Sequence, residues 1–261
     1  MCIRDRDIYL TYQDCSNVYG DDDNTLIQDL VKQQNICTAK FNRQTRTFEI
    51  VNTVDAAADK YRSCQTAGTM NGAAVTAWVE NSGSDIFEEK DIFNQNDTNE
   101  IWYSTYDGMS WSVPVNEITG ARGVTALAVT DSGIAYVSDT DMDLNTDEDK
   151  ELYIGGNVLD AGSISGLRVC DGIMMWVNDG ILKKYDGNTV SVVFDDVEIS
   201  SEFTFEDNTL YYIAAGERWS NIYKRVYDTS SGSWLDDVKL TSVEKNLVGD
   251  REHIDIDNGQ F

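Results

Sequence analysis

A hairpin pattern recurs along this chain of 261 residues and constrains its fold more than any other feature. In each copy, an alternating strand and a tight turn lead into a strongly apolar strand. The copies read TMNGAAVTAWVEN (69–81), TDSGIAYVSD (130–139), VCDGIMMWVND (169–179) and FEDNTLYYIAA (205–215), and HIDIDNGQF (253–261) begins a fifth. The second turn residue stands at positions 72, 133, 172, 208 and 259, so the pattern recurs every 36 to 61 residues. Asn-Gly and Asp-Gly pairs favour two-residue hairpins because both residues tolerate positive φ.

A second hairpin follows the first in most copies and completes a unit of four strands. Its turns lie within FNRQTRTF (41–48), YDGMSW (106–111), YDGNTV (185–190) and YDTSSGSW (227–234). The second strand of each unit is nearly all apolar, which indicates that neighbouring units cover both of its faces. Four-stranded units with a period of about 40–50 residues are typical of propeller blades. The sequence therefore predicts an all-β fold, a β-propeller of four-stranded antiparallel blades, in which four strands lie near the axis: 73–80, 134–138, 173–178 and 209–214.

About five blades are expected, and the blades at the two ends of the chain are incomplete. A partial blade at 7–54 precedes blades near 61–119, 123–163, 166–198 and 201–246. A spare strand is expected near 250–261. In one alternative, this strand pairs with the partial blade and closes a five-bladed ring. In the other, the chain is part of a larger ring. The opening letters MCIRD resemble the translated end of a sequencing-library adapter. We therefore interpret residues 1–6 as non-native sequence and residues 7–261 as a single propeller domain, itself a fragment.

The charge balance narrows the range of partners. The chain has 46 acidic residues against 20 basic ones, which gives a net charge of −26. A surface this negative repels phosphate backbones, so neither nucleic acid nor an anionic membrane is an expected partner. No apolar run approaches the roughly 18 residues of a transmembrane helix, so membrane insertion is not expected. The composition favours cations as ligands and an exposed, extracellular setting.

The cysteines exclude two common kinds of site. The chain has five cysteines: Cys2, Cys15, Cys37, Cys64 and Cys170. No two of them have the spacing Cys-x-x-Cys. Zinc ribbons and thioredoxin chemistry therefore have no support. Cys15 and Cys37 flank an inserted loop, where they either face each other across a hairpin or remain two free thiols.

One hairpin carries a motif of a known family. Within YSTYDGMSWS (103–112), four residues fit positions of the Asp-box pattern Ser-x-Asp-x-Gly-x-Thr-Trp: Ser104, Asp107, Gly108 and Trp111. Tyr106 stands in place of the Asp of the motif, and Ser110 in place of its Thr. The chain thus resembles the sialidase-like and related bacterial surface propellers. The resemblance implies a propeller at the cell surface, in which the box is a structural turn on the blade edge and lies away from the active centre.

Acidic insertions follow the second strand of the first three blades, at 15–34, 81–100 and 139–151. In a propeller this connection always emerges on the same face, so we expect the three insertions to gather on one rim. The third has oxygen-bearing residues at every second position: Asp139, Asp141, Asp143, Asn145 and Asp147. Calcium loops place their ligands at such spacing, and the sequence predicts a weak Ca²⁺ site here, because Leu144 and Lys150 depart from the calcium-loop pattern. The alternative is a solvated acidic loop.

No catalytic constellation is recognisable. His253 is the only histidine, and the chain has neither a Gly-rich phosphate loop, nor Gly-x-Ser-x-Gly, nor His-Glu-x-x-His. Trp78, Trp176 and Trp219 either stack on sugars or belong to the core. We therefore expect a non-catalytic extracellular module that binds a glycan or a protein through its acidic rim. The alternative is a sialidase-like glycoside hydrolase with part of its active site missing, which a pair of carboxylates about 5–10 Å apart in a central cleft would favour.

Overall fold

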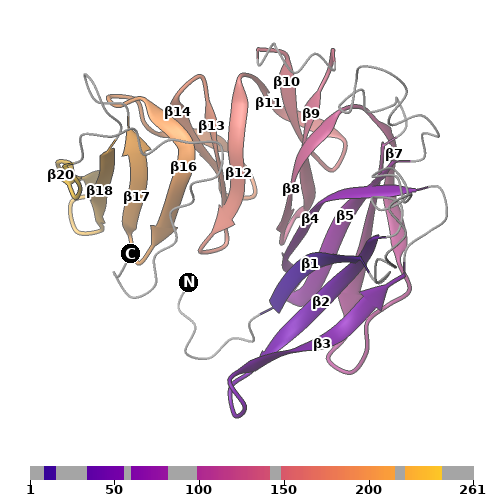
Figure 1. Ribbon diagram of the computed structural model, residues 1–261. Coiled ribbons are helices and arrows are strands. Elements are labelled where there is room, and N and C mark those ends of the chain that lie inside the picture. The colour runs from indigo at the N-terminus through magenta and orange to yellow at the C-terminus, as the bar shows by residue number, and fades with distance from the viewer. Residues whose placement is uncertain are drawn as a thin grey trace, which may run out of the picture. The chain divides into compact units, whose positions relative to one another are not determined.

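The computed structural model describes residues 9–15, 34–55, 60–81, 99–141, 148–214 and 221–242. Within these ranges every regular element is a β-strand, and all paired strands are antiparallel (Figure 1). No helix in this part of the chain is long and apolar enough to cross a membrane. The strands belong to two compact units, Ile3–Ala161 and Gly162–Phe261, and each unit is described by itself.

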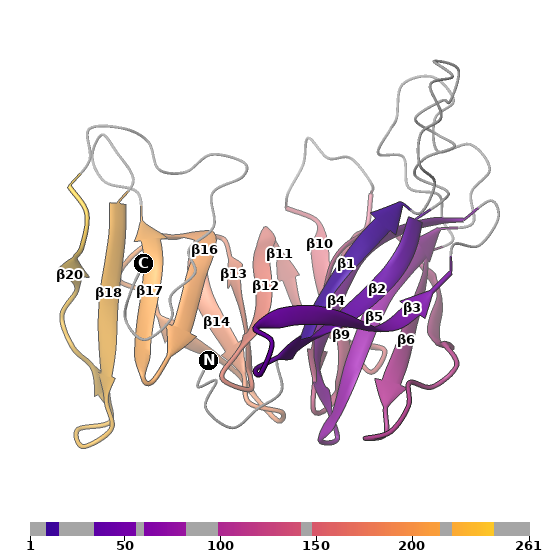
Figure 2. The ribbon, with the colours of Figure 1, turned by 60° about the horizontal axis from the view of Figure 1, so that its bottom comes forward.

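The first unit holds three sheets. One sheet has three strands in the order β1 (Tyr9–Cys15), β2 (Gln34–Asn42) and β3 (Thr47–Val54). The next has four strands, β4 (Tyr61–Met70), β5 (Ala73–Asn81), β6 (Asn99–Tyr106) and β7 (Val115–Ala121). The third also has four, β8 (Val124–Thr130), β9 (Gly133–Asp139), β10 (Lys150–Ile154) and β11 (Asn157–Gly162). In both views the three-stranded sheet lies beside β4 and β5 (Figures 1 and 2).

The second unit holds two sheets. The first has four strands, β12 (Ile164–Cys170), β13 (Ile173–Asn178), β14 (Ile181–Tyr185) and β15 (Val190–Phe194). The second begins with β16 (Ile199–Glu206), β17 (Thr209–Ala214) and β18 (Asn221–Asp228). Its outer strand is split into two short pieces, β19 (Ser233–Trp234) and β20 (Val238–Lys239), and both pair with β18.

This architecture confirms the predicted class, a β-propeller of four-stranded antiparallel blades, and the partial blade is the three-stranded sheet. The four apolar strands predicted near the axis are β5, β9, β13 and β17. Each is the second strand of its sheet, one place in from the edge strand that precedes it. Within the first unit, the edge strands β4 and β8 of neighbouring sheets pack against each other. The spare strand expected near 250–261, with its possible closure of a ring, lies outside the described residues.

The Asn-Gly and Asp-Gly hairpin turns have the backbone that the sequence predicts, whereas the turn of the second copy lies at 131–132, one residue before the predicted position, and has no positive φ at either residue. Asn71 and Gly72 have φ of 52° and 77°, and Asp171 and Gly172 have φ of 50° and 79°. Two consecutive positive φ angles characterise type I′ turns, whose twist matches that of the flanking strands. The Asn-Gly and Asp-Gly pairs therefore fix the hairpins that carry the apolar strands into the core.

The apolar strands are buried between sheets. In the first unit, the core between neighbouring sheets includes Val75, Val79 and Val129. Trp78 and Trp176 are fully buried, which confirms the alternative that they are core residues, whereas Trp219 lies outside the described residues. Polar contacts also join sheets: the hydroxyls of Thr38 on β2 and Thr76 on β5 lie 2.8 Å apart and are buried.

Candidate functional site

An acidic triad forms where β9 ends and β10 begins. Asp139 is the last residue of β9, and Asp149 immediately precedes β10. One carboxylate oxygen from each of Asp139, Asp141 and Asp149 lies within 4.8 Å of the others. The main chain holds this geometry, because the Asp141 amide donates to Asp149 Oδ2 at 3.0 Å and the Thr140 hydroxyl donates to the Asp149 carbonyl at 2.7 Å.

Two of the five predicted calcium ligands belong to this triad. The structure brings Asp139 and Asp141 together, while the other three fall outside the described residues: Asp143, Asn145 and Asp147. Asp149 does not appear in the sequence prediction, although it is one step further along the same alternation. Its carboxylate is half-buried, and its Oδ1 accepts no hydrogen bond from the described residues. The triad thus offers the oxygen ligands that a hard cation prefers. The third candidate ligand, Asp149, is recognised only from the pairing of β9 with β10.

A pocket of about 220 Å³ opens near the triad, and its lining includes Thr140, the residue between Asp139 and Asp141. Its wall contains a stacked pair of tyrosines, Tyr136 on β9 and Tyr153 on β10, whose ring centroids are 4.8 Å apart with an angle of 5° between the planes. The other lining residues are polar or small: Gly120, Ala121, Arg122, Ser138 and Thr140. The pocket therefore combines aromatic surface with the hydroxyl-bearing residues Ser138 and Thr140.

Hydrogen bonds fix the polar groups of this pocket. The Ser138 hydroxyl donates to the Arg122 carbonyl, and the Tyr153 hydroxyl donates to the Glu151 carboxylate. The hydrogen bond to Glu151, together with burial, raises the pKa of Tyr153 to about 12. The phenol therefore stays protonated at neutral pH and donates its hydrogen bond to Glu151.

A second polar cluster lies at the start of β4 and includes two carboxylates. Lys60 Nζ donates to Glu80 Oε2 at 2.9 Å and to Glu100 Oε2 at 3.1 Å. Arg62 Nε donates to Glu80 Oε1 at 2.9 Å, and its Nη1 donates to the Val54 carbonyl of β3 at 2.8 Å. Glu80 and Glu100 are opposite each other on β5 and β6. The cluster thus fastens two strands of one sheet to the neighbouring three-stranded sheet.

The environment of Glu80 opposes donation of a proton. Burial would raise the pKa of Glu80, but the hydrogen bond from Lys60 and the charge of Arg62 outweigh it and lower the pKa. A general acid in a glycoside hydrolase needs the opposite, a raised pKa. Glu80 is only 5% exposed, and its Oε1 also accepts from the Trp78 indole at 3.3 Å. Glu80 therefore belongs to a buried ion pair with Arg62, and Lys60 links this pair to the partly exposed Glu100.

The Asp-box-like hairpin is a structural turn. Asp107 Oδ1 accepts hydrogen bonds from the amides of Met109 and Ser110, both at 2.8 Å. The Tyr106 hydroxyl donates to the Gly108 carbonyl at 3.0 Å. The hairpin follows the C-terminal end of β6, whereas Glu100 lies near the N-terminal end of that strand. The turn is therefore at the opposite end of the blade from the polar cluster.

The same turn recurs in the second unit. Asp186 Oδ1 accepts from the amides of Asn188 and Thr189, both at 2.9 Å, and the Tyr185 hydroxyl donates to the Gly187 carbonyl at 2.8 Å. At Asp228, hydrogen bonds from Ser230 and Ser231 lower the carboxyl pKa to about 2. Three blades thus use an ionised aspartate to close the turn between their third strand and the strand that follows.

Three cysteines of the described residues are free thiols: Cys37, Cys64 and Cys170. Cys37 is buried and unbridged, and it lies opposite Tyr12 on β1, whereas Cys15 is opposite Gln34. Three residues of strand separate the two cysteine positions, about 10 Å, and a disulfide requires Cα atoms within about 7 Å. Of the two alternatives, the one in which Cys15 and Cys37 face each other across the hairpin is therefore wrong, and the one with free thiols holds for Cys37.

Comparison with known proteins supports the fold. No protein-family model and no curated protein matches the chain. Among solved structures, the acylaminoacyl peptidase of Pyrococcus horikoshii is similar over 83% of this chain and 38% of its own, at 12% identity and a TM-score of 0.50. An acylaminoacyl peptidase in complex with Z-Gly-Gly-Phe-chloromethyl ketone is similar over 84% of this chain and 36% of its own, at 13% identity and a TM-score of 0.51. The chain spans little more than a third of either peptidase chain, and at this identity the likeness establishes the fold alone.

Proposed function

We propose that this chain is a ligand-binding β-propeller module of an extracellular or cell-surface protein. Its ligand is a glycan, bound at the Tyr136–Tyr153 pocket without chemical conversion. The observation that carries the proposal is the stacked tyrosine pair in a polar pocket of about 220 Å³ beside the acidic triad. The bacterial surface propellers that the chain resembles in one motif support the location, and the net charge of −26 argues against nucleic acid as a partner.

The pocket suits a sugar for two physical reasons. Sugar rings present apolar C–H faces that pack on aromatic side chains, and their hydroxyl groups need hydrogen-bond partners when they leave water. Tyr153 supplies aromatic surface, while Ser138, Thr140 and Arg122 supply polar groups around it. A volume of about 220 Å³ is small for a binding pocket, which favours one sugar residue of a longer chain rather than a whole oligosaccharide.

Replacing Tyr153 by Ala is expected to weaken glycan binding about tenfold, because truncating an aromatic anchor removes its packing surface. Tyr153→Phe keeps that surface and should bind within about threefold of the wild type. The measurement is calorimetric titration with a panel of neutral xylo-, manno- and cello-oligosaccharides. Tyr223→Ala is the matched control, since Tyr223 stacks on Tyr212 at 5.8 Å in the other unit and does not line the pocket.

Two results would contradict this function. One is the absence of binding to any oligosaccharide in the panel, or an equal loss of binding in Tyr153→Ala and Tyr223→Ala. The other is hydrolysis of an aryl-glycoside or sialoside panel that disappears in Glu100→Gln. That second result would establish the glycoside hydrolase alternative, whose motivation is the Glu80–Glu100 pair held by one lysine.

The acidic triad is proposed to bind Ca²⁺ with millimolar affinity. Three carboxylates within 4.8 Å repel one another unless a cation neutralises them, and the Oδ1 atom of Asp149 offers a buried oxygen for this purpose. At 10 mM Ca²⁺ and a Kd of about 1 mM, binding would stabilise the fold by about 1.4 kcal/mol and raise Tm by about 2–4 °C. The shift should disappear in the double variant Asp141→Asn, Asp149→Asn, and persist in Asp131→Asn, at the other end of β9. An equal shift in all three proteins would mean that the triad is a solvated acidic loop.

A further inference from the structure

One face of the three-stranded sheet is formed by uncharged side chains, in a chain of which one residue in four is charged. Residues that the register places directly opposite one another share a face of the sheet, and side chains along a strand alternate between its faces. By this rule eight residues form one face, here called the outer face: Leu10 with Ala39 and Ile50, Tyr12 with Cys37 and Thr53, and Phe41 with Phe48.

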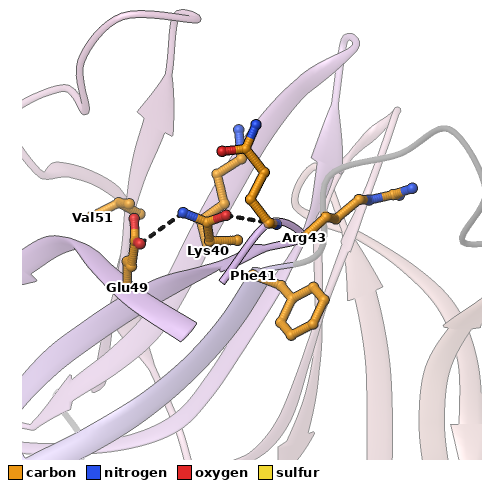
Figure 3. A pocket seen from close by; sticks show the side chains of 7 residues that line it. Lys40, Phe41, Arg43, Glu49 and Val51 are labelled. Carbon is orange, nitrogen blue, oxygen red and sulfur yellow. Dashed lines mark hydrogen bonds between the residues drawn. The ribbon is translucent and has the colours of Figure 1, made fainter. Parts of the chain in front are cut away.

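The outer face exposes three large apolar side chains. Leu10 is 46% exposed, Phe48 is 48% exposed and Ile50 is 58% exposed. The ring of Phe41 packs beside that of Phe48 with 5.2 Å between the centroids, and Figure 3 shows it pointing away from Glu49, which belongs to the opposite face. Exposed apolar side chains gathered on one face mark a surface that contacts another protein.

The opposite face of the same sheet shows how such a surface is covered in this fold. The Thr38 hydroxyl meets that of Thr76 on β5, and Gln13 Nε2 donates to the Arg62 carbonyl of β4 at 2.6 Å. Trp78 lies on the same side of β5 as Thr76, because side chains alternate along a strand, and it is fully buried. A sheet that lies face to face on another thus buries its side chains, and the outer face has the composition for the same packing.

Charge is distributed unequally along this sheet. Exposed Arg46 lies in the turn that precedes β3, whereas exposed Asp55 directly follows β3. Asp14, near the end of β1, is exposed at the same end as Asp55. A strand of eight residues is about 26 Å long, so the sheet has a basic end and an acidic end that are well separated.

From this arrangement we infer that the outer face is the interface of a symmetric dimer, in which a second copy of this chain packs its own outer face against it. Two sheets stacked in this way lie about 10 Å apart, and a two-fold axis makes the interface self-complementary. If the axis runs across the strands, β3 of one copy lies over β3 of the other in the reverse direction. Arg46 of each copy then lies over Asp55 of its partner, while Phe48 and Ile50 are buried between the sheets.

The charge of the chain favours this place for contact between two copies. Two chains with a net charge of −26 repel each other over most of their surfaces. Residues 34–54 are the exception, since they include three basic residues against one acidic residue. Two copies therefore approach each other with least repulsion at this sheet. The inference goes beyond the glycan pocket at Tyr153 and does not depend on it.

The test is sedimentation of the full chain at about 1–200 µM protein in about 0.3 M salt. A reversible dimer with a Kd of about 1–100 µM is expected. Lowering the salt to about 20 mM should weaken it at least about threefold, because the repulsion between the two acidic chains is then less screened. Ile50→Asp and Leu10→Asp should each weaken the dimer at least about thirtyfold, because each places a carboxylate between the sheets. Val158→Asp is the matched control: it adds the same charge at a side chain that is 50% exposed on β11, and it should stay within about threefold of the wild type.

A charge exchange tests the orientation of the two copies. Arg46→Glu should weaken the dimer about fivefold, because two carboxylates then face each other at both ends of the interface. Adding Asp55→Lys should restore the affinity to within about twofold of the wild type. Adding Asp131→Lys instead makes the same change in net charge at the turn before β9, and it should not restore the affinity.

Three outcomes would overturn the inference. A chain that sediments as a monomer up to about 200 µM would mean that a different protein, or the chain itself, covers the outer face. A dimer that persists in both Ile50→Asp and Leu10→Asp would use another surface. Equal weakening by Ile50→Asp and Val158→Asp would mean that added charge, and not packing at the outer face, controls association. The concentration and salt dependence use the wild-type chain, so they decide the question even where a variant fails to fold.

Discussion

Replacing Arg62 by Ala is expected to lower the free energy of unfolding by about 3–5 kcal/mol, because it leaves the buried Glu80 carboxylate without its closest charged partner. Arg62 is 4% exposed and Glu80 is 5% exposed, so water compensates neither group well. Arg62 Nη2 lies 2.8 Å from Glu80 Oε1, and the same guanidinium donates to the Val54 carbonyl of the neighbouring sheet. The substitution therefore removes both an ion pair and a connection between blades.

The control for this prediction is Arg46→Ala, on the exposed turn of the β2–β3 hairpin. That substitution should change the free energy of unfolding by no more than about 0.5 kcal/mol. Urea denaturation at pH 7 measures both variants, and the slope with denaturant shows whether the unfolding transition is otherwise the same. Equal stability of the two variants would mean that the Arg62–Glu80 pair is not buried in solution.

The pH dependence of the same pair has a definite sign. The pKa of Glu80 is lowered from its ordinary value of 4.5, so at a pH near that value its carboxyl group is less protonated in the folded chain than in the unfolded one. The stability that it contributes is fully present above about pH 4.5 and is lost as the pH falls through the lowered pKa. The difference between wild type and Arg62→Ala should therefore shrink between pH 5 and pH 3, whereas an uncharged packing defect would leave it constant.

The fold could be predicted because its signals are local and repeated. Asn71-Gly72 and Asp171-Gly172 adopt the positive φ angles that these residue types tolerate, and each pair is followed by a strand that is buried on both faces. A hairpin and its strands lie within about a dozen residues, so the sequence pattern contains all the information that the hairpin needs. Repetition of that unit then left few architectures other than blades.

The polar sites were harder to predict because strand pairing, and not spacing along the sequence, brings their residues together. Lys60 contacts Glu80 and Glu100, which are 20 and 40 residues further along the chain. The pairing of β5 with β6 puts these two glutamates opposite each other, and no spacing rule identifies them. Asp149 joins Asp139 for the same reason, since β10 returns antiparallel to β9. A five-residue alternation indicated the acidic loop but did not identify the residue that completes the triad.

Bulges in the first strand of each full blade were also absent from the sequence prediction. The register shifts between Ser63 and Thr66 on β4, and between Ser165 and Arg168 on β12. A left-handed residue occupies both bulges, Cys64 with φ of 52° and Gly166 with φ of 62°. A cysteine occupies the left-handed position of one bulge and a glycine that of the other, so no single residue type identifies this position in the sequence. Only the pairing with the next strand shows where the bulge lies.

Gly166→Ala is expected to destabilise the second unit by about 2–5 kcal/mol, through backbone strain and overpacking together. A Cβ at this position would lie 2.4 Å from the Ser201 carbonyl oxygen of β16, and main-chain atoms cannot move aside as a flexible side chain does. The same carbonyl accepts a hydrogen bond from Arg168 Nη2 at 3.0 Å, and the Phe203 carbonyl accepts one from Nη1 at 2.6 Å. Displacing β16 would therefore disturb the contacts through which Arg168 joins the two sheets of this unit.

Gly172→Ala provides the control, because Gly172 has a similar positive φ of 79° but has no atom within 4 Å of its added Cβ. It should show the backbone strain alone, about 1–2 kcal/mol. The difference between the two variants then isolates the close approach of β12 to β16. The measurement is urea denaturation followed by tryptophan fluorescence, to which the buried Trp176 in the same sheet contributes. If both alanine variants lose the same stability, the two sheets are not as close at Gly166 as the blade packing requires.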